Sequence, residues 1–195
     1  MWVMPEDAED PAAVPRERRR RRISTRSLLV CAGFGAIGAL VLGVVSPATS
    51  ALAAAFPPAY AFVAGIHSLL PFIARRALGF DWAATLVGVF MGVLSVGFTA
   101  LGPLIVVPLV ISGVSFAATL AVQRRRRPLR ESDYFVAAAV SGVMLFVVSL
   151  PVMNPERIGI GLLVLTLLGR LTGQIAAAGV AALVTRRLNH AGIRG

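Results

Sequence analysis

The sequence has no lysine, one cysteine and two histidines in its 195 residues. A single cysteine, Cys31, excludes an internal disulfide framework and a multi-cysteine metal site. The histidines, His67 and His190, lie in different segments without metal-ligand spacing, so we expect neither a metal nor another cofactor. Charged residues make up 14% of the chain and hydrophobic residues 57%, with a mean hydropathy of +0.81. This balance argues against a water-soluble globular domain and indicates a membrane protein.

Motifs for covalent chemistry are also missing from the sequence. We find no pair of a nucleophile and a base and no Walker motif, so we expect no catalytic residues and no ATP hydrolysis by this chain. Gly33, Gly35 and Gly38 match the spacing of a dinucleotide-binding fingerprint, but they lie in an apolar segment that no strand precedes. The basic residues do not alternate with aromatic residues on a face, so we do not expect nucleic acid as a partner.

Long apolar blocks dominate the rest of the chain. Six of them are present, at 28–45, 57–74, 83–101, 103–122, 134–152 and 158–184. Most approach the roughly 20 residues that cross a hydrocarbon core. Backbone groups facing lipid must be paired within a helix, and the alternating pattern of a barrel strand is absent. The sequence therefore predicts an all-α integral membrane protein, a bundle of about six transmembrane helices within residues 28–188.

The arginines predict the orientation of this bundle. Residues 1–27 contain a run of arginines and too few apolar residues to fold, so we expect a disordered tail. If this tail is cytoplasmic, every arginine except Arg157 and Arg170 falls in the tail or at a cytoplasmic end of a block. This distribution follows the positive-inside rule. Both termini, including the short tail at 189–195, are therefore predicted to be cytoplasmic, in a multi-pass protein of the cell membrane.

Two segments allow another interpretation. The first block follows a basic region and precedes Ala51-Leu52-Ala53, which resembles a signal-peptidase site, so a cleaved signal peptide is an alternative to a first transmembrane helix. Its apolar stretch is long for that role. The second block begins at Pro57-Pro58 and contains Pro71, so its helix can be kinked or partly re-entrant.

A polar stripe interrupts the sixth block. Arg170 lies well inside it, where a charge costs roughly 2.5–3.5 kcal/mol on insertion scales. Thr166, Arg170 and Gln174 are four residues apart and therefore share one helix face. Arg170 can anchor an anionic or carbonyl group of a ligand. Alternatively, it can bond backbone carbonyls freed by prolines, or its side chain can reach the membrane surface.

Other candidate ligand contacts lie at the outer ends of the blocks. Tyr60 lies near the start of the second block, and Asn154 and Glu156 lie between the fifth and the sixth. Aromatic, amide and charged groups at the mouth of a bundle suit a small-molecule pocket, although interfacial residues often look the same.

The first block carries small residues along one face, at Ala32, Gly35, Ala36, Ala39 and Gly43. Such faces allow helices in lipid to approach closely. The partner of this face is either another helix of the bundle or a separate membrane subunit.

Three stretches of the chain resemble the S components of energy-coupling-factor (ECF) vitamin transporters, especially the hydroxymethylpyrimidine/thiamine permease type. Residues 32–36 look like the AxxxA motif of that family, residues 70–88 like its basic turn between two helices, and residues 170–192 like its closing helix. The resemblance implies capture of a small water-soluble vitamin or precursor at a bacterial cytoplasmic membrane. It also implies ATP-binding subunits in trans and a transmembrane coupling subunit, which Ala32 and Ala36 would contact.

A different class of function is compatible with the same sequence. A membrane scaffold or assembly protein would use its arginine-rich tail to bind anionic lipid or a cytoplasmic partner. It would bind no stoichiometric small ligand. An intramembrane enzyme is a third alternative, for which the sequence offers no catalytic pair.

Overall fold

The structure is a computed structural model that describes residues 24–153 and 159–191. Helices account for most of the described residues, and no strand occurs among them. In chain order the elements are α1 (Thr25–Ala55), α2 (Pro57–Val63), the 3-10 helix η1 (Ala64–Ser68), α3 (Leu69–Leu78), α4 (Ala83–Ser95), the 3-10 helix η2 (Gly102–Ile105), α5 (Val106–Arg126), α6 (Glu131–Met153) and α7 (Ile160–His190).

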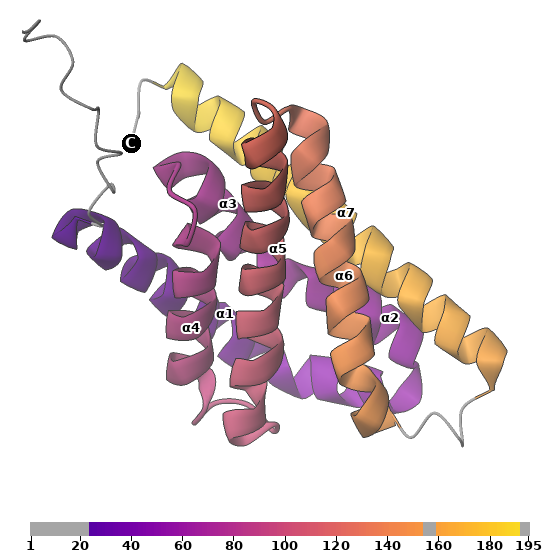
Figure 1. Ribbon diagram of the computed structural model, residues 1–195. Coiled ribbons are helices and arrows are strands. Elements are labelled where there is room, and N and C mark those ends of the chain that lie inside the picture. The colour runs from indigo at the N-terminus through magenta and orange to yellow at the C-terminus, as the bar shows by residue number, and fades with distance from the viewer. Residues whose placement is uncertain (1–23, 154–158, 192–195) are drawn as a thin grey trace, which may run out of the picture.

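The helices form a closed bundle (Figure 1). Contacts run from α1 to α4, then through α5 and α6 to α7, and α7 packs in turn against α2 and α3, which return to α1. α4, α5 and α6 stand side by side in Figure 1, whereas the long helices α1 and α7 run obliquely to them. The C-terminal ends of α3, α5 and α7 and the N-terminal end of α6 lie at the same end of the bundle.

Five segments of the described chain are long and apolar enough to cross a membrane. They are 25–55, 57–78, 102–126, 131–151 and 160–190. α4 is apolar as well, but its 13 residues extend only about 20 Å, less than a typical hydrocarbon core. The expected third block reached residue 101, whereas the helix ends at Ser95 and turns follow it. Gly102, with a φ of 54°, completes the reversal toward α5 in a left-handed conformation that favours glycine.

α1 is longer than the expected first block, which stopped before Pro47. The helix includes this proline and continues to Ala55. Most of the residues at 48–55, which follow Pro47, are alanine. Alanine has the highest intrinsic helix propensity. The hydroxyl of Thr49 donates to the backbone carbonyls of Val45 and Ser46, each 3.0 Å away. The segment expected outside the first helix is therefore part of α1.

The second block is an interrupted helix. α2, η1 and α3 follow one another without a loop, and the 3-10 turn of η1 joins the two α-helices. A 3-10 segment within a helix changes its pitch and direction. α3 ends at Gly79, whose φ of 68° provides a left-handed cap.

Each of the last three helices, α5, α6 and α7, extends at one end beyond its apolar block into a charged segment. α5 continues through the arginines to Arg126, and α7 continues to His190. α6 begins at Glu131, and Asp133 accepts a hydrogen bond of 2.7 Å from the backbone N–H of Arg130. Acidic side chains in the first turn of a helix favour its formation, so α6 begins earlier than the apolar block.

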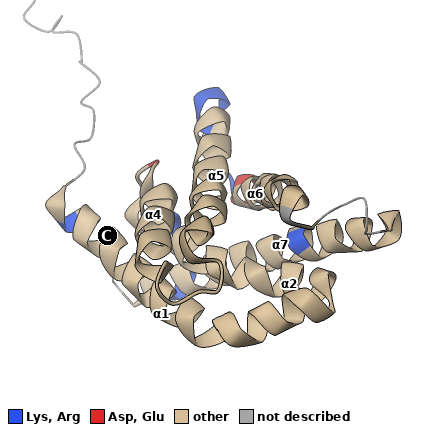
Figure 2. Cartoon of the chain, turned by 90° about the horizontal axis from the view of Figure 1, so that it is seen from below, with Lys and Arg blue, Asp and Glu red and all other residues tan. Residues whose placement is uncertain are grey.

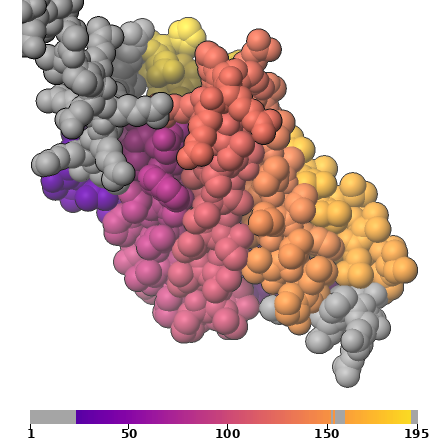
Figure 3. Space-filling view, in the orientation of Figure 1, coloured from indigo at the N-terminus to yellow at the C-terminus, as the bar shows by residue number. Residues whose placement is uncertain are grey.

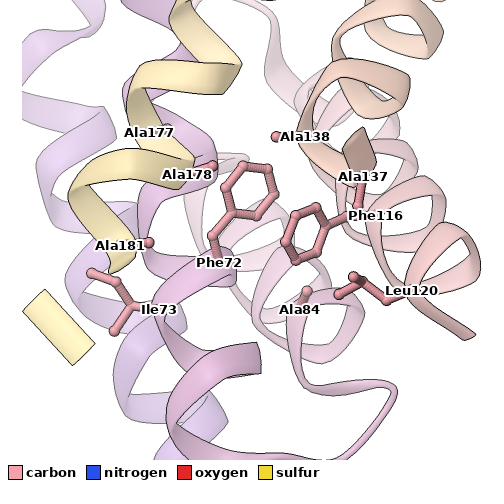
Figure 4. Packing of buried hydrophobic residues seen from close by; sticks show 10 residues of the cluster. All are labelled: Phe72, Ile73, Ala84, Phe116, Leu120, Ala137, Ala138, Ala177, Ala178 and Ala181. Carbon is pink, nitrogen blue, oxygen red and sulfur yellow. The ribbon is translucent and has the colours of Figure 1, made fainter. Parts of the chain in front are cut away.

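A cluster of aromatic and small residues fills the centre of the bundle (Figure 4). The rings of Phe72 in α3 and Phe116 in α5 stack with centroids 3.9 Å apart. Buried alanines from α4, α6 and α7 surround them, including Ala84, Ala137 and Ala178. Small side chains at these positions let the helices pack closely around the ring pair.

Candidate functional site

Arg170 lies in the interior of the bundle, in the middle of α7. Its side chain is 8% exposed, and its Nε atom has no hydrogen-bond partner among the described residues. The guanidinium carbon lies 5.9 Å from the centre of the Tyr60 ring, which α2 provides. This distance is at the outer limit of a cation–π contact. Two of the residues predicted for the site, far apart in sequence, therefore lie next to each other.

The alternatives for Arg170 can be compared with this geometry. Its side chain is too well covered to reach the membrane surface. Within the described part of the chain, it donates no hydrogen bond to a freed backbone carbonyl. The three described carboxylates, those of Asp81, Glu131 and Asp133, pair with other arginines. Arg170 is thus a buried cation whose donors are not all used by the protein residues described.

Thr166 and Gln174 are buried on the same face of α7 as Arg170. Thr166 is 2% exposed, and its hydroxyl donates to the carbonyl of Leu162 at 2.7 Å, within its own helix. Gln174 is fully buried and its Nε2 atom donates to the Oγ atom of Ser68, 2.8 Å away. The Oε1 atom of Gln174 has no partner among the described residues. The stripe therefore presents an unpaired donor at Arg170 and an unpaired acceptor one turn later.

Serines extend this polar contact across the bundle. The Oγ atoms of Ser68 and Ser112 are 2.9 Å apart, and those of Ser112 and Ser141 are 3.0 Å apart. The hydroxyl of Ser141 also lies 3.2 Å from the backbone carbonyl of Ser112, to which it donates. If each hydroxyl donates once, the hydrogen bonds run from Gln174 through Ser68 and Ser112 to Ser141 and end on that carbonyl. This order leaves Oε1 of Gln174 as the free acceptor.

Three glycines bring the site together. A Cβ atom on Gly169 would lie 2.5 Å from the carbonyl oxygen of Pro58, and one on Gly173 would collide with the carbonyl oxygen of Phe62. A Cβ atom on Gly65, in η1, would collide with the backbone of Gly173. The backbones of α2 and η1 therefore touch that of α7, and this approach places Tyr60 near Arg170 and Ser68 near Gln174.

Asn154 and Glu156, the other two predicted ligand contacts, lie outside the described residues. The serines of the chain across the bundle were not predicted. Each is a polar residue within an apolar block, which is a signal for interhelical hydrogen bonding. Their sequence positions do not reveal that they meet.

The predicted docking residues Ala32 and Ala36 are partly buried in α1. The neighbouring Gly35 and Ala39 are buried, and a Cβ atom on Gly35 would lie 2.5 Å from the Cβ atom of Phe90 in α4. Part of the small-residue face thus packs within the bundle. On the other side of α1, Gly33 has no atom within 4 Å of a Cβ position, and the exposed fractions of the large apolar side chains are 55% at Ile37, 68% at Leu40 and 81% at Val44.

Comparison with known proteins gives one informative match. No protein-family model and no curated protein matches the chain. A solved structure described as "Crystal structure of an S-component of ECF transporter" matches with a TM-score of 0.78, at 21% sequence identity, over 87% of each chain. The chain therefore has the fold of that S-component, and the predicted all-α membrane bundle is confirmed. The cytoplasmic placement of the termini stays a prediction.

Proposed function

We propose that this chain is the substrate-binding subunit of an ECF-type importer for a small water-soluble vitamin or vitamin precursor. The observation that carries the proposal is the shared fold with an S-component over 87% of both chains. The buried polar stripe of α7 supports it independently, because unpaired donors and acceptors inside an apolar bundle are costly unless a ligand or water satisfies them.

The site itself suggests how a ligand is held. Arg170 would donate to an acceptor of the substrate, and Oε1 of Gln174 would accept from a substrate donor one turn away. The Tyr60 ring would cover one side of the ligand. Thr166 would line the same face of the site and present its hydroxyl oxygen to the ligand. Asn154 and Glu156 are proposed contacts at the outer mouth.

These groups favour hydroxymethylpyrimidine over thiamine within the substrate type that the sequence resembles. Hydroxymethylpyrimidine is neutral and carries ring-nitrogen acceptors beside an amino donor, which matches a donor next to an acceptor. Thiamine adds a permanently charged thiazolium ring. Among the described residues, Arg170 would repel that charge in the low-dielectric interior of the bundle, and no carboxylate lies beside it.

Transport would require other subunits. The chain would capture its substrate from outside, and a transmembrane coupling subunit with ATP-binding subunits would power the import. Ala32, Ala36 and the adjacent open face of α1 would contact the coupling subunit, because exposed apolar side chains flank small residues there. The arginine-rich ends would face the cytoplasm of a bacterial cell membrane.

Affinity purification tests the proposal directly. The tagged full chain is isolated from the membranes of its own host in mild detergent, and stoichiometric partners are identified by mass spectrometry. Recovery of one multi-span protein together with one or two ATPases containing Walker motifs is the expected result. Repeated isolation of the chain alone, or with unrelated proteins, would contradict the importer and favour the membrane scaffold.

A further inference from the structure

The end of the bundle opposite the α4–η2 turn carries a dense set of charges. Figure 2 shows basic residues at the tip of α5, with acidic residues beside α6 and at the turn before α4. Asp81 accepts hydrogen bonds from both Arg75 and Arg124, each at 2.9 Å. The two other described carboxylates each accept a two-pronged pair of hydrogen bonds, Glu131 from Arg76 and Asp133 from Arg127.

Arginine remains in excess after this pairing. Arg75 and Arg124 share the single negative charge of Asp81, so their group keeps a net positive charge. The exposed Arg125 and Arg126 follow on the same turn of α5. The paired carboxylates therefore do not neutralise this end of the bundle.

A pocket of about 310 Å³ opens between the end of α3 and the α5–α6 connection. Its lining consists of Arg75, Gly79, Arg124, Pro128, Leu129 and Tyr134. Arg75 is 3% exposed, and its Nε atom has no partner among the described residues. The side chain of Arg124 is 57% exposed. One buried and one accessible arginine thus line the same space, and the buried one retains an unused donor.

We propose that this pocket binds the phosphate group of an anionic phospholipid. Phosphate oxygens accept hydrogen bonds from arginine in a planar fork geometry, and two arginines that share one carboxylate leave a positive charge for the anion to neutralise. Basic pockets between transmembrane helices are known positions for anionic headgroups. The pocket is separate from the Arg170 site and does not depend on the importer being the correct function.

The surroundings favour a lipid over a protein carboxylate or a free phosphate ion. Trp82 follows Asp81 directly and is 55% exposed, as expected of an aromatic residue at the membrane–water interface. Exposed apolar side chains continue from this level on α5 and α6, two of the helices that border the pocket, with Val122 on α5 52% exposed and Val136 on α6 48% exposed. The α5–α6 end also protrudes from the molecule in Figure 3. A phosphate in the pocket would have apolar helix surface nearby for its acyl chains.

Native mass spectrometry of the delipidated full chain in a neutral detergent tests this site. The protein is titrated with phosphatidylglycerol and, separately, with phosphatidylcholine of the same chain length. The informative variant is Arg124→Gln, and its control is Arg126→Gln, which removes the same charge from the same helix without lining the pocket. Thermal unfolding of each variant establishes that it is folded.

We expect one phosphatidylglycerol to bind the unaltered protein in preference to phosphatidylcholine. Arg124→Gln should weaken this binding by about tenfold or more, because a charged hydrogen bond is lost, whereas Arg126→Gln should change it by less than about twofold. Equal losses in the two variants would overturn the pocket, since they would indicate general attraction to a basic surface.

Two further arms test the source of the anion. Inorganic phosphate that binds alone as tightly as the lipid, and displaces it, would show that the ligand is a soluble phosphate and would overturn the lipid assignment. Unchanged lipid binding by Arg124→Gln, together with loss of a co-purifying protein, would assign the pocket to an acidic group of that protein instead.

Discussion

The amide nitrogen of Gln174 in α7 donates a hydrogen bond to the hydroxyl oxygen of Ser68 in η1, 2.8 Å away, although the two residues are 106 positions apart. This contact joins η1, the 3-10 turn that interrupts the second membrane segment, to the polar stripe of α7. Since both side chains are buried, removing one partner leaves the other unsatisfied in an apolar environment.

Ser68→Ala should therefore lower the free energy of unfolding by about 1 kcal/mol, the magnitude of an interhelical hydrogen bond in a membrane protein. Thermal unfolding in detergent measures the change. Ser115→Ala is the matched control, because the hydroxyl of Ser115 bonds only carbonyls of its own helix α5. An equal loss in the control would show that the Ser68–Gln174 contact adds nothing beyond the removal of a hydroxyl.

Arg170→Met should separate ligand binding from stability. The substitution removes the donor proposed to hold the substrate, so hydroxymethylpyrimidine binding measured by calorimetry should fall by about tenfold or more. Thermal stability should stay the same or rise, because a buried charge with an unpaired donor is replaced by an unbranched apolar side chain. Arg170→Lys keeps the charge but loses the planar fork.

A clear loss of stability in Arg170→Met with ligand affinity intact would reverse this assignment. Arg170 would then be a structural cation, and the ligand would have to bind elsewhere. The same calorimetry should show weaker binding of thiamine than of hydroxymethylpyrimidine to the unaltered chain, since the thiazolium charge opposes that of Arg170.

Gly173→Ala should destabilise the bundle by about 1–3 kcal/mol, because the added methyl group would collide with the backbone carbonyl of Phe62 and push α2 away from α7. Gly179→Ala in the same helix provides the comparison. Its added methyl group would meet only the ring of Phe135, at 3.9 Å, and alanine favours a helix more than glycine does. Similar unfolding temperatures for the two variants would contradict the close approach of α2 and α7.

Ala32→Leu with Ala36→Leu should prevent recovery of the coupling subunit in affinity purification while ligand binding is retained. Both positions are partly buried at the border of the open face of α1, so larger side chains would project toward a partner. Val147→Leu, on the exposed face of α6, controls for added apolar volume at another lipid-facing position. Normal partner recovery by the double variant would exclude this face as the docking surface.

The sequence predicts the architecture well because the hydrocarbon core imposes a simple rule. Apolar blocks that approach the thickness of a bilayer must be helical, and the predicted all-helical membrane bundle is confirmed. The ends of the helices follow other forces. α1 continues through Pro47 into an alanine-rich segment, α4 stops at Ser95, and α6 begins at Glu131 through an acidic first turn. The mean hydropathy of a block does not indicate where its helix begins or ends.

Part of the site was predictable because a membrane-spanning block must be helical. Thr166, Arg170 and Gln174 share a face of one helix, and helical periodicity alone places them together. The contact of Tyr60 with Arg170 and the serine chain depend on how separate helices pack. Ser68 and Ser112 are 44 positions apart, and Ser112 and Ser141 are 29 positions apart. No local sequence pattern indicates that residues this far apart along the chain are in contact.

If each hydroxyl donates once, the hydrogen bonds from Gln174 to the carbonyl of Ser112 all run in one direction, and this order has an electrical consequence. The aligned N–H and O–H dipoles all point their positive ends away from the free carbonyl oxygen of Gln174, so the negative end of the array lies one helical turn from Arg170. Such an array offsets part of the cost of a buried cation without a countercharge. In this arrangement oriented dipoles offset part of the charge of the Arg170 guanidinium, whose Nε atom has no partner among the described residues and stays available to an incoming ligand.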